Sequence, residues 1–147
     1  MIAIGCDHGG YGLKKEIEAY LDSRGLEYRD YGCDSTDSVD YPIYARKVAH
    51  AIVKGECERG ILICGTGIGI SIAANKVKGA YCALVTDVYQ AQRAQLSNNA
   101  NMIAFGSQIM GIELAKCLVK EYLSNQFDPQ SRSLPKVERI VQYEENH

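Results

Sequence analysis

The sequence lacks any long hydrophobic segment, and no apolar run reaches the roughly 18 residues that a membrane-spanning helix needs. It also lacks an excess of positive charge, since 16 Lys and Arg residues face 18 Asp and Glu residues and the net charge is −2. A chain without an overall basic field has little means of recruiting nucleic acid, and local cationic groups would have to hold any small anionic substrate. We therefore expect neither a membrane nor a nucleic-acid partner.

Secretion and metal-binding signals are absent as well. Met1 leads directly into an apolar run, without the basic segment that opens a signal peptide. Six cysteines are present, but no CxxC pair or Cys/His spacing typical of structural zinc. Three of them (Cys6, Cys64 and Cys82) lie in or at the end of apolar runs, where a reduced cysteine behaves as a small hydrophobic residue. We expect a cytoplasmic protein with reduced thiols and no metal or other cofactor.

Short apolar runs alternate with segments of helical periodicity over residues 1–147, with no linker, repeat or low-complexity stretch. This alternation predicts one α/β domain, with a five-stranded parallel sheet covered by helices on both faces. The expected strands are residues 2–6, 27–31, 59–64, 80–85 and 101–106. The expected helices are residues 13–21, 41–54, a short one ending near residue 74, then 87–96, 111–123 and 137–143.

The expected strand order, 2-1-3-4-5, indicates where a ligand would bind. In a doubly wound sheet, ligands bind beyond the carboxyl ends of the strands at the point where the strand order reverses, which here lies between the first and third strands. The first strand ends at Asp7-His8-Gly9-Gly10, and the third ends at Cys64, followed by a glycine-rich loop over residues 65–69. The two most unusual segments of the sequence therefore meet at one crevice.

Cys64 is the candidate nucleophile or base. It follows a strand and precedes a helix, and the free N–H groups of a helix N-terminus favour the thiolate form of a cysteine. Thr66 is placed to hydrogen-bond the sulfur. The backbone amides of residues 65–69 suit an oxyanion that develops beside the atom a thiolate deprotonates. A buried structural cysteine followed by a tight turn is the alternative interpretation.

Other glycine-loop functions fit the loop less well. Gly-x-Gly-x-Gly differs from the dinucleotide fingerprint because its third glycine comes one residue early, although Asp87 after the next strand keeps a nucleotide-binding alternative open. No Lys-Ser/Thr pair follows the last glycine, as a Walker loop requires. A cysteine phosphatase loop needs an arginine six residues after the cysteine, and Ile70 occupies that position.

Polar residues at the crevice suit a sugar substrate. His8 can transfer a proton or bind phosphate, and Asp7 can hold a sugar hydroxyl or assist ring opening. Capping of the first helix is the alternative role for Asp7. Tyr41 stands at the start of its helix, where a packing role is the more common one.

Two further groups lie outside this crevice. The amide side chains of Ser97-Asn98-Asn99-Ala100-Asn101 suit sugar hydroxyls or a turn, but this segment precedes the fifth strand, at the wrong edge for its own chain's site. If it contributes, it reaches in from a partner subunit. Arg132 and Lys136 are spaced to grip one phosphate, with a solvated charged tail as the alternative.

Four segments together resemble the type B ribose-5-phosphate isomerases of the RpiB/LacAB sugar-phosphate isomerase family. The segments are Asp7 to Gly10, Asp40-Tyr41-Pro42, Gly60 to Lys76, and Asn101 to Ser107. The resemblance implies a Rossmann-like three-layer sandwich and a homodimer, sometimes a tetramer, with sites at the subunit interface and the tail from about residue 124 on or near a partner. It also implies metal-free interconversion of ribose 5-phosphate and ribulose 5-phosphate in the non-oxidative pentose phosphate pathway.

The resemblance assigns roles residue by residue. It makes Cys64 the base, and residues Gly65, Thr66, Gly67, Ile68 and Gly69 the loop that stabilises the enediolate. Its implied sugar and phosphate contacts are Asp7, His8, Tyr41, Asn98, Gln108, Arg132 and Lys136. Ser97 replaces a histidine that opens the sugar ring in many members, so ring opening is expected to fall to Asp7, His8 or Ser97 with water. Gln108 replaces a phosphate-binding arginine, so weaker phosphate binding is expected. These departures leave open a six-carbon aldose 6-phosphate, such as allose or galactose 6-phosphate, or a free aldose. A non-catalytic sugar-phosphate or nucleotide-binding module is the alternative from another class.

Overall fold

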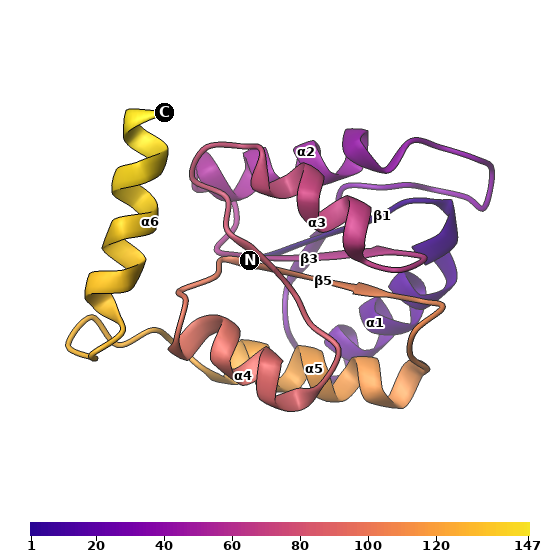
Figure 1. Ribbon diagram of the computed structural model, residues 1–147. Coiled ribbons are helices and arrows are strands. Elements are labelled where there is room, and N and C mark those ends of the chain that lie inside the picture. Colours follow the sequence, from indigo (N-terminus) through magenta and orange to yellow (C-terminus); the bar gives the residue numbers. More distant parts are fainter.

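Five parallel strands form one sheet in the computed structural model, which describes residues 1–147 (Figure 1). The strands are β1 (Ile2–Cys6), β2 (Tyr28–Asp30), β3 (Arg59–Cys64), β4 (Cys82–Leu84) and β5 (Met102–Gly106). The helices are the short 3-10 helix η1 (His8–Gly10), α1 (Tyr11–Ser23), α2 (Tyr41–Val53), α3 (Ile68–Asn75), α4 (Val88–Leu96), α5 (Ile112–Ser124) and α6 (Leu134–Asn146). The predicted fold class is confirmed, and none of these helices has the length and apolarity that a membrane crossing requires.

The strand order is β2-β1-β3-β5-β4, so the predicted order was wrong for the last two strands. All five residues of β5 are buried, whereas the three residues of β4 are only partly covered or exposed. The more apolar strand therefore takes the interior position beside β3, and the shorter strand takes the edge. The reversal between β1 and β3 is unaffected, so the predicted crevice remains.

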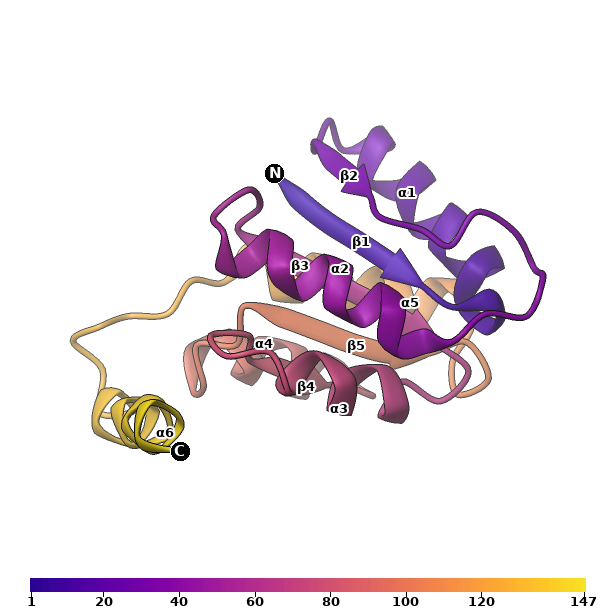
Figure 2. The same ribbon diagram turned by 90° about the horizontal axis from the view of Figure 1, so that it is seen from above.

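Helices cover both faces of the sheet (Figures 1 and 2). One face packs against α1, α4 and α5, and the other packs against α2 and α3. Alternate residues of β3 point to opposite faces, so Ile61 and Ile63 enter the first core while Leu62 and Cys64 enter the second. Cys64 is thereby directed toward the side on which α3 begins.

Helix α6 stands apart from the other elements (Figures 1 and 2). It starts earlier than predicted, at Leu134, with Pro135 in its first turn, where the missing N–H costs no helical bond. None of its residues is buried. Its link to the body is Glu144, whose Oε1 accepts hydrogen bonds from the Gly79 amide (3.0 Å) and the Tyr81 hydroxyl (2.7 Å).

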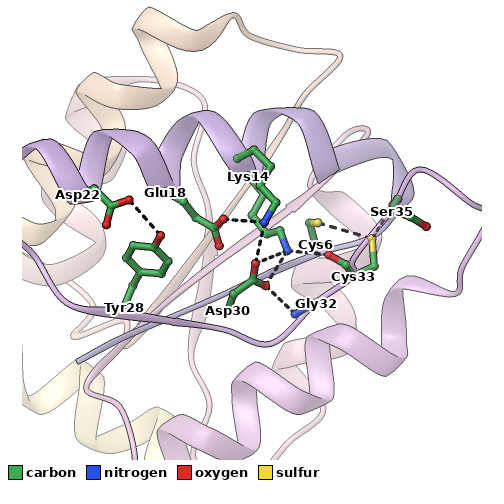
Figure 3. Close-up of polar contacts among 10 residues, drawn as sticks. Cys6, Lys14, Glu18, Asp22, Tyr28, Asp30, Gly32, Cys33 and Ser35 are labelled. Atoms are coloured by element: carbon green, nitrogen blue, oxygen red, sulfur yellow. Dashed lines mark hydrogen bonds and ion pairs between the residues drawn. The ribbon is translucent and has the colours of Figure 1, made fainter.

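A buried lysine fastens the loop that follows β2 (Figure 3). Lys14 is fully buried, and its Nζ donates to both carboxylate oxygens of Asp30 (2.6 and 2.8 Å) and to the carbonyl oxygen of Cys33 (2.7 Å). The amide of Gly32 donates to the same carboxylate at 2.8 Å. Burial raises the pKa of Asp30, but interactions with Glu18, Lys14 and the Gly32 amide outweigh it and hold that pKa at about 2. The loop therefore leaves the sheet from a fixed starting point.

Candidate active site at the carboxyl ends of β1 and β3

The thiol of Cys64 lies at the N-terminus of α3. Its side chain is buried, and the backbone amide of Gly67 donates to Sγ at 3.1 Å. Gly67 has a φ of +82°, a left-handed conformation that glycine adopts without strain, and this turn directs the amide back to the sulfur. The predicted hydrogen bond from Thr66 to the sulfur is not formed. The Thr66 hydroxyl instead accepts a bond from the Ile68 amide at 3.2 Å and so shapes the start of the helix.

Three strand ends are joined around the Cys64 loop. After β5, the Ser107 amide donates to the Cys64 carbonyl oxygen at 2.9 Å, and the Gln108 amide donates to the Gly65 carbonyl oxygen at 2.9 Å. The Ser107 hydroxyl donates to the Gly9 carbonyl oxygen at 2.6 Å, which connects this segment to the end of β1. The loop is therefore held by two backbone hydrogen bonds from the segment after β5, and a side-chain hydrogen bond ties that segment to the end of β1, which gives the fixed geometry that a preorganised oxyanion site requires.

Asp7 and His8 lie beside this loop with part of their polar capacity already used. The amides of Gly9 (3.0 Å) and Gly10 (3.2 Å) donate to Oδ1 of Asp7, so the capping role considered for Asp7 is present. Its Oδ2 has no hydrogen bond within the chain. The Val39 amide donates to Nδ1 of His8 at 3.0 Å, which leaves the proton of the neutral imidazole on Nε2.

Tyr41 and Gln108 complete this side of the crevice. A β-carbon on Gly69 would lie 2.5 Å from Cζ of Tyr41, so the phenol ring packs directly on the glycine loop. A β-carbon on Gly65 would lie 3.5 Å from the amide carbon of Gln108. The structure thus brings together one group of predicted residues, the Cys64 cluster, consisting of Asp7, His8, Tyr41, residues 64–69 and Gln108. None of these residues is a lysine or an arginine.

The other predicted residues gather elsewhere. Ser97, Asn98, Arg132 and Lys136 line one cavity of about 590 Å³ between the end of α4 and the start of α6, and we call them, with Arg93, the Arg132 cluster. This cluster lies near the amino ends of the strands, where the Gly60 amide donates to the Asn101 carbonyl oxygen. A six-residue strand places its two ends roughly 16 Å apart, so within one chain the two clusters do not meet.

Arg93 is a member of this cavity that the sequence analysis missed. Its Nε donates to Oγ of Ser97 at 2.7 Å, one helical turn further along the chain. The i,i+4 spacing of the two residues was the available signal. No carboxylate forms an ion pair with Arg93, Arg132 or Lys136. Three cations that share a cavity without a counter-charge favour an anionic ligand.

Two alternatives from the sequence lose support in the structure. Asp87 accepts a hydrogen bond from the Gln90 amide at 2.7 Å and so caps α4, which accounts for its presence without a nucleotide. Ile70, at the position where a cysteine phosphatase loop would need arginine, is fully buried in the core against α2. No group of three or more His, Cys, Asp and Glu side chains is arranged to hold a metal ion.

Comparison with known proteins agrees with this arrangement. The family described as Ribose/Galactose Isomerase matches residues 2–140. The chain belongs to this family. It is similar to ribose-5-phosphate isomerase B of Escherichia coli K12, with 47% identity over 98% of this chain and 96% of the relative. It is also similar to D-erythrulose-4-phosphate isomerase of Pectobacterium atrosepticum, with 48% identity over 97% of this chain and 94% of the relative.

Solved structures give the same result. The structure of Clostridium thermocellum ribose-5-phosphate isomerase B superposes with a TM-score of 0.95 and 46% sequence identity, and the match covers 99% of this chain and 97% of that one. The match extends through the whole fold, including the detached helix α6. The family prediction made from the sequence motifs is therefore confirmed.

Proposed function

We propose that the protein is an aldose–ketose isomerase that interconverts ribose 5-phosphate and ribulose 5-phosphate through an enediolate, as part of the non-oxidative pentose phosphate pathway. The observation that carries this proposal is the Cys64 thiol, which lies at the N-terminus of α3 with the Gly67 amide donating to its sulfur. The names of the E. coli and C. thermocellum relatives support the choice of a five-carbon substrate.

The geometry of the Cys64 cluster supports the following chemistry. The thiolate removes the C2 proton of the open-chain aldose, and negative charge builds on the C1 oxygen. Backbone amides of residues 65–69 receive that charge, because the first turn of a helix has N–H groups without intrahelical partners. The proton of the C2 hydroxyl moves to the C1 oxygen and the thiol returns its proton to C1, which gives the ketose with its carbonyl at C2. No charge has to leave the site, and no redox partner is needed.

We further propose that the two clusters form one composite site across a homodimer, with the Cys64 cluster of one subunit facing the Arg132 cluster of the other. The Cys64 cluster has a base but no cation for the phosphate, and the Arg132 cluster has three cations but no base. Apolar side chains beside each cluster are exposed in the single chain, among them Ile68 (50%) and Ile72 (55%) on α3 and Ile140 (48%) on α6. A second copy would cover them.

The activity is tested on a panel of substrates with two cysteine variants. Cys64→Ala is expected to lower turnover of ribose 5-phosphate by about 10²–10⁴-fold, the usual contribution of a positioned acid–base group. Cys117→Ala is the matched control, because this thiol lies on an exposed part of α5 outside both clusters. Turnover like that of the wild type in Cys64→Ala would refute the assignment of the base.

The panel also separates the remaining alternatives. It should contain allose 6-phosphate, galactose 6-phosphate, the free sugars and a four-carbon aldose phosphate, since one relative is named for erythrulose 4-phosphate. A clear preference for a six-carbon or free sugar would change the assigned substrate but would leave the proposed isomerase mechanism unchanged. Binding of sugar phosphates without any turnover would favour the non-catalytic module.

Mixing of variants tests the shared site. Cys64→Ala homodimers lack the base, and homodimers of an Arg132→Ala/Lys136→Ala double variant lack two phosphate-binding cations. A mixed dimer has one site with both defects and one intact site, so an equal mixture should regain about a quarter of wild-type activity after subunit exchange. Recovery that never exceeds the sum of the two variants would refute the composite site.

A further inference from the structure

Gln95 lies on α4 and is only 3% exposed, although its side chain is a polar amide. Its Nε2 donates to the carbonyl oxygen of Ala100 at 2.7 Å, and its Oε1 accepts from the backbone amide of Phe127 at 2.9 Å. The second bond joins residues that are 32 positions apart in the chain. A buried amide whose two ends are both bonded in this way fixes the segments that it joins.

The cavity of the Arg132 cluster has two walls that come from separate parts of the chain. One wall is formed by the end of α4 and the segment that follows it, and the other by the tail before α6 and the first turns of that helix. The bond from Gln95 to Ala100 holds the segment that carries Asn98. The bond from Gln95 to Phe127 holds the tail five residues before Arg132. Gln95 therefore ties the two walls to each other, although it does not line the cavity.

Few other hydrogen bonds hold this tail. Residues 128–143 make hydrogen bonds only within the tail and α6. The tie that precedes Gln95 is the bond from the Arg59 guanidinium to the Asn125 carbonyl oxygen at 2.7 Å. Loss of the Gln95 bond would therefore lengthen the free segment in front of Arg132 by two residues. Since fixing the backbone of a single residue changes an equilibrium constant by about 5–30-fold, a phosphate should bind the freed tail more weakly by about this factor.

We propose that Gln95 is a positioning residue for phosphate binding and holds Arg132 opposite Asn98 through its bond to the tail. It does not reach the ligand itself. It limits the motion of the residues that do, which is how preorganisation increases affinity. This role rests on the phosphate site proposed above and specifies what keeps that site in place before a ligand arrives.

The affinity for inorganic phosphate, measured by isothermal titration calorimetry, tests this role without any need for turnover. Gln95→Met keeps the length of the side chain, removes both hydrogen bonds and should raise the dissociation constant by about 5–30-fold. Tyr122→Phe is the matched control, because the Tyr122 hydroxyl donates to the same Ala100 carbonyl oxygen at 2.7 Å but not to the tail. It should leave the phosphate affinity unchanged, and an equal loss in both variants would overturn the inference.

A second pair of variants removes the same bond from the tail side, where the substitution leaves the core residue in place. Phe127→Pro removes the N–H group that donates to Gln95, because proline has none, and it should weaken phosphate binding as Gln95→Met does. Phe127→Ala loses the ring but keeps the N–H group and should bind phosphate like the wild type. Circular dichroism confirms that each variant is folded. Unchanged phosphate affinity in folded Gln95→Met and Phe127→Pro would refute the positioning role.

A double variant shows whether Gln95 acts through Arg132. In the Arg132→Ala background, Gln95→Met should cause no further loss of phosphate affinity, because the residue that it positions is gone. A loss as large as in the wild-type background would contradict the proposal.

Steady-state kinetics with ribose 5-phosphate give a separate measurement. In Gln95→Met, KM should rise with the dissociation constant of phosphate while kcat stays within about twofold, as expected when only binding is affected. A fall in kcat at unchanged KM would count against the positioning role. Failure of the isomerase function would look different, since the wild type would then convert no substrate while the phosphate affinities of the variants still differed as expected.

Discussion

Lys14→Met is expected to lower the free energy of unfolding by about 3 kcal/mol at pH 7, the lower end of the range for breaking a buried ion pair by removing one partner. The ammonium group of Lys14 is fully buried and donates three hydrogen bonds, of which two reach Asp30 and one reaches the Cys33 carbonyl oxygen. Methionine keeps the apolar part of the side chain and removes all three bonds. The lower end of the range applies because the Asp30 side chain is 24% exposed and regains some contact with water.

The pKa of Asp30 gives an independent check of this magnitude. Its folded-state pKa of about 2 lies below the ordinary value of 3.8, a difference of 1.8, and each unit of pKa corresponds to about 1.4 kcal/mol. The carboxylate therefore contributes about 2 kcal/mol of stability, allowing for its partial exposure, and Lys14 supplies part of this beside Glu18 and the Gly32 amide. The unpaired carbonyl oxygen of Cys33 accounts for the remainder of the expected loss.

The sign of the pH dependence follows from the direction of the shift. Because the folded-state pKa of Asp30 is lowered, its contribution is present above pH 4 and is lost as the pH falls toward 2. Burial and the nearby Asp30 raise the pKa of Glu18, which faces the same cluster together with Lys15, so Glu18 partly opposes the loss in acid. Wild-type stability should therefore decline more steeply between pH 4 and 2 than that of Lys14→Met.

Urea unfolding followed by far-ultraviolet circular dichroism, at one fixed protein concentration, measures both effects. Lys15→Met is the control, because Lys15 is a neighbour on the same helix that contacts the same carboxylates with a side chain 49% exposed. Exposed ion pairs contribute about 0–1 kcal/mol, so the control should lose less than 1 kcal/mol. Equal losses in the two variants, or parallel acid profiles for Lys14→Met and the wild type, would refute the reasoning.

Three further outcomes are expected from other parts of the molecule. Gly106→Ala should cost about 1–3 kcal/mol in thermal unfolding and reduce kcat, because the new β-carbon would lie 2.5 Å from the Thr66 backbone and displace the loop of residues 65–69. Arg132→Ala should raise KM for a sugar phosphate and weaken its dependence on ionic strength, with no change for a free sugar; steady-state kinetics at two salt concentrations decide this. Iodoacetamide at pH 8 should label the exposed Cys117 and spare Cys6, whose pKa burial raises to about 12; mass spectrometry of the folded protein would contradict this if both were modified at equal rates.

Much of the fold follows from local pattern. Apolar runs located β1, β3, β4 and β5 within two residues at either end, because strands in the interior of a parallel sheet carry nearly continuous hydrophobic residues. The interior position of β5 could not be predicted from local pattern, because it depends on which of the two strands β4 and β5 loses less buried apolar surface at the edge of the sheet. The burial of Lys14 could not be predicted either, because a lysine in a helical pattern is expected at the surface.

The candidate site could be predicted in part for the same reason. Cys64 and its loop were accessible to sequence reasoning, since a strand, a cysteine and three glycines specify a turn at a helix N-terminus. The predicted hydrogen bond from Thr66 to the Cys64 sulfur was wrong. The Gly67 amide donates to the sulfur instead, and the Thr66 hydroxyl accepts from the Ile68 amide. Arg93 was missed because its importance comes from a cavity between α4 and α6, which segments about 40 residues apart create only after folding.

The detached position of α6 predicts that specific activity depends on protein concentration. In a subunit on its own, this helix buries no residue and is linked to the body mainly through Glu144, so little free energy fixes its orientation. Lys136 lies on that helix, and Arg132 precedes it. With the composite site proposed above, specific activity should therefore fall once the protein is diluted far enough for a homodimer to dissociate, and a saturating sugar phosphate should oppose that fall by bridging the two clusters.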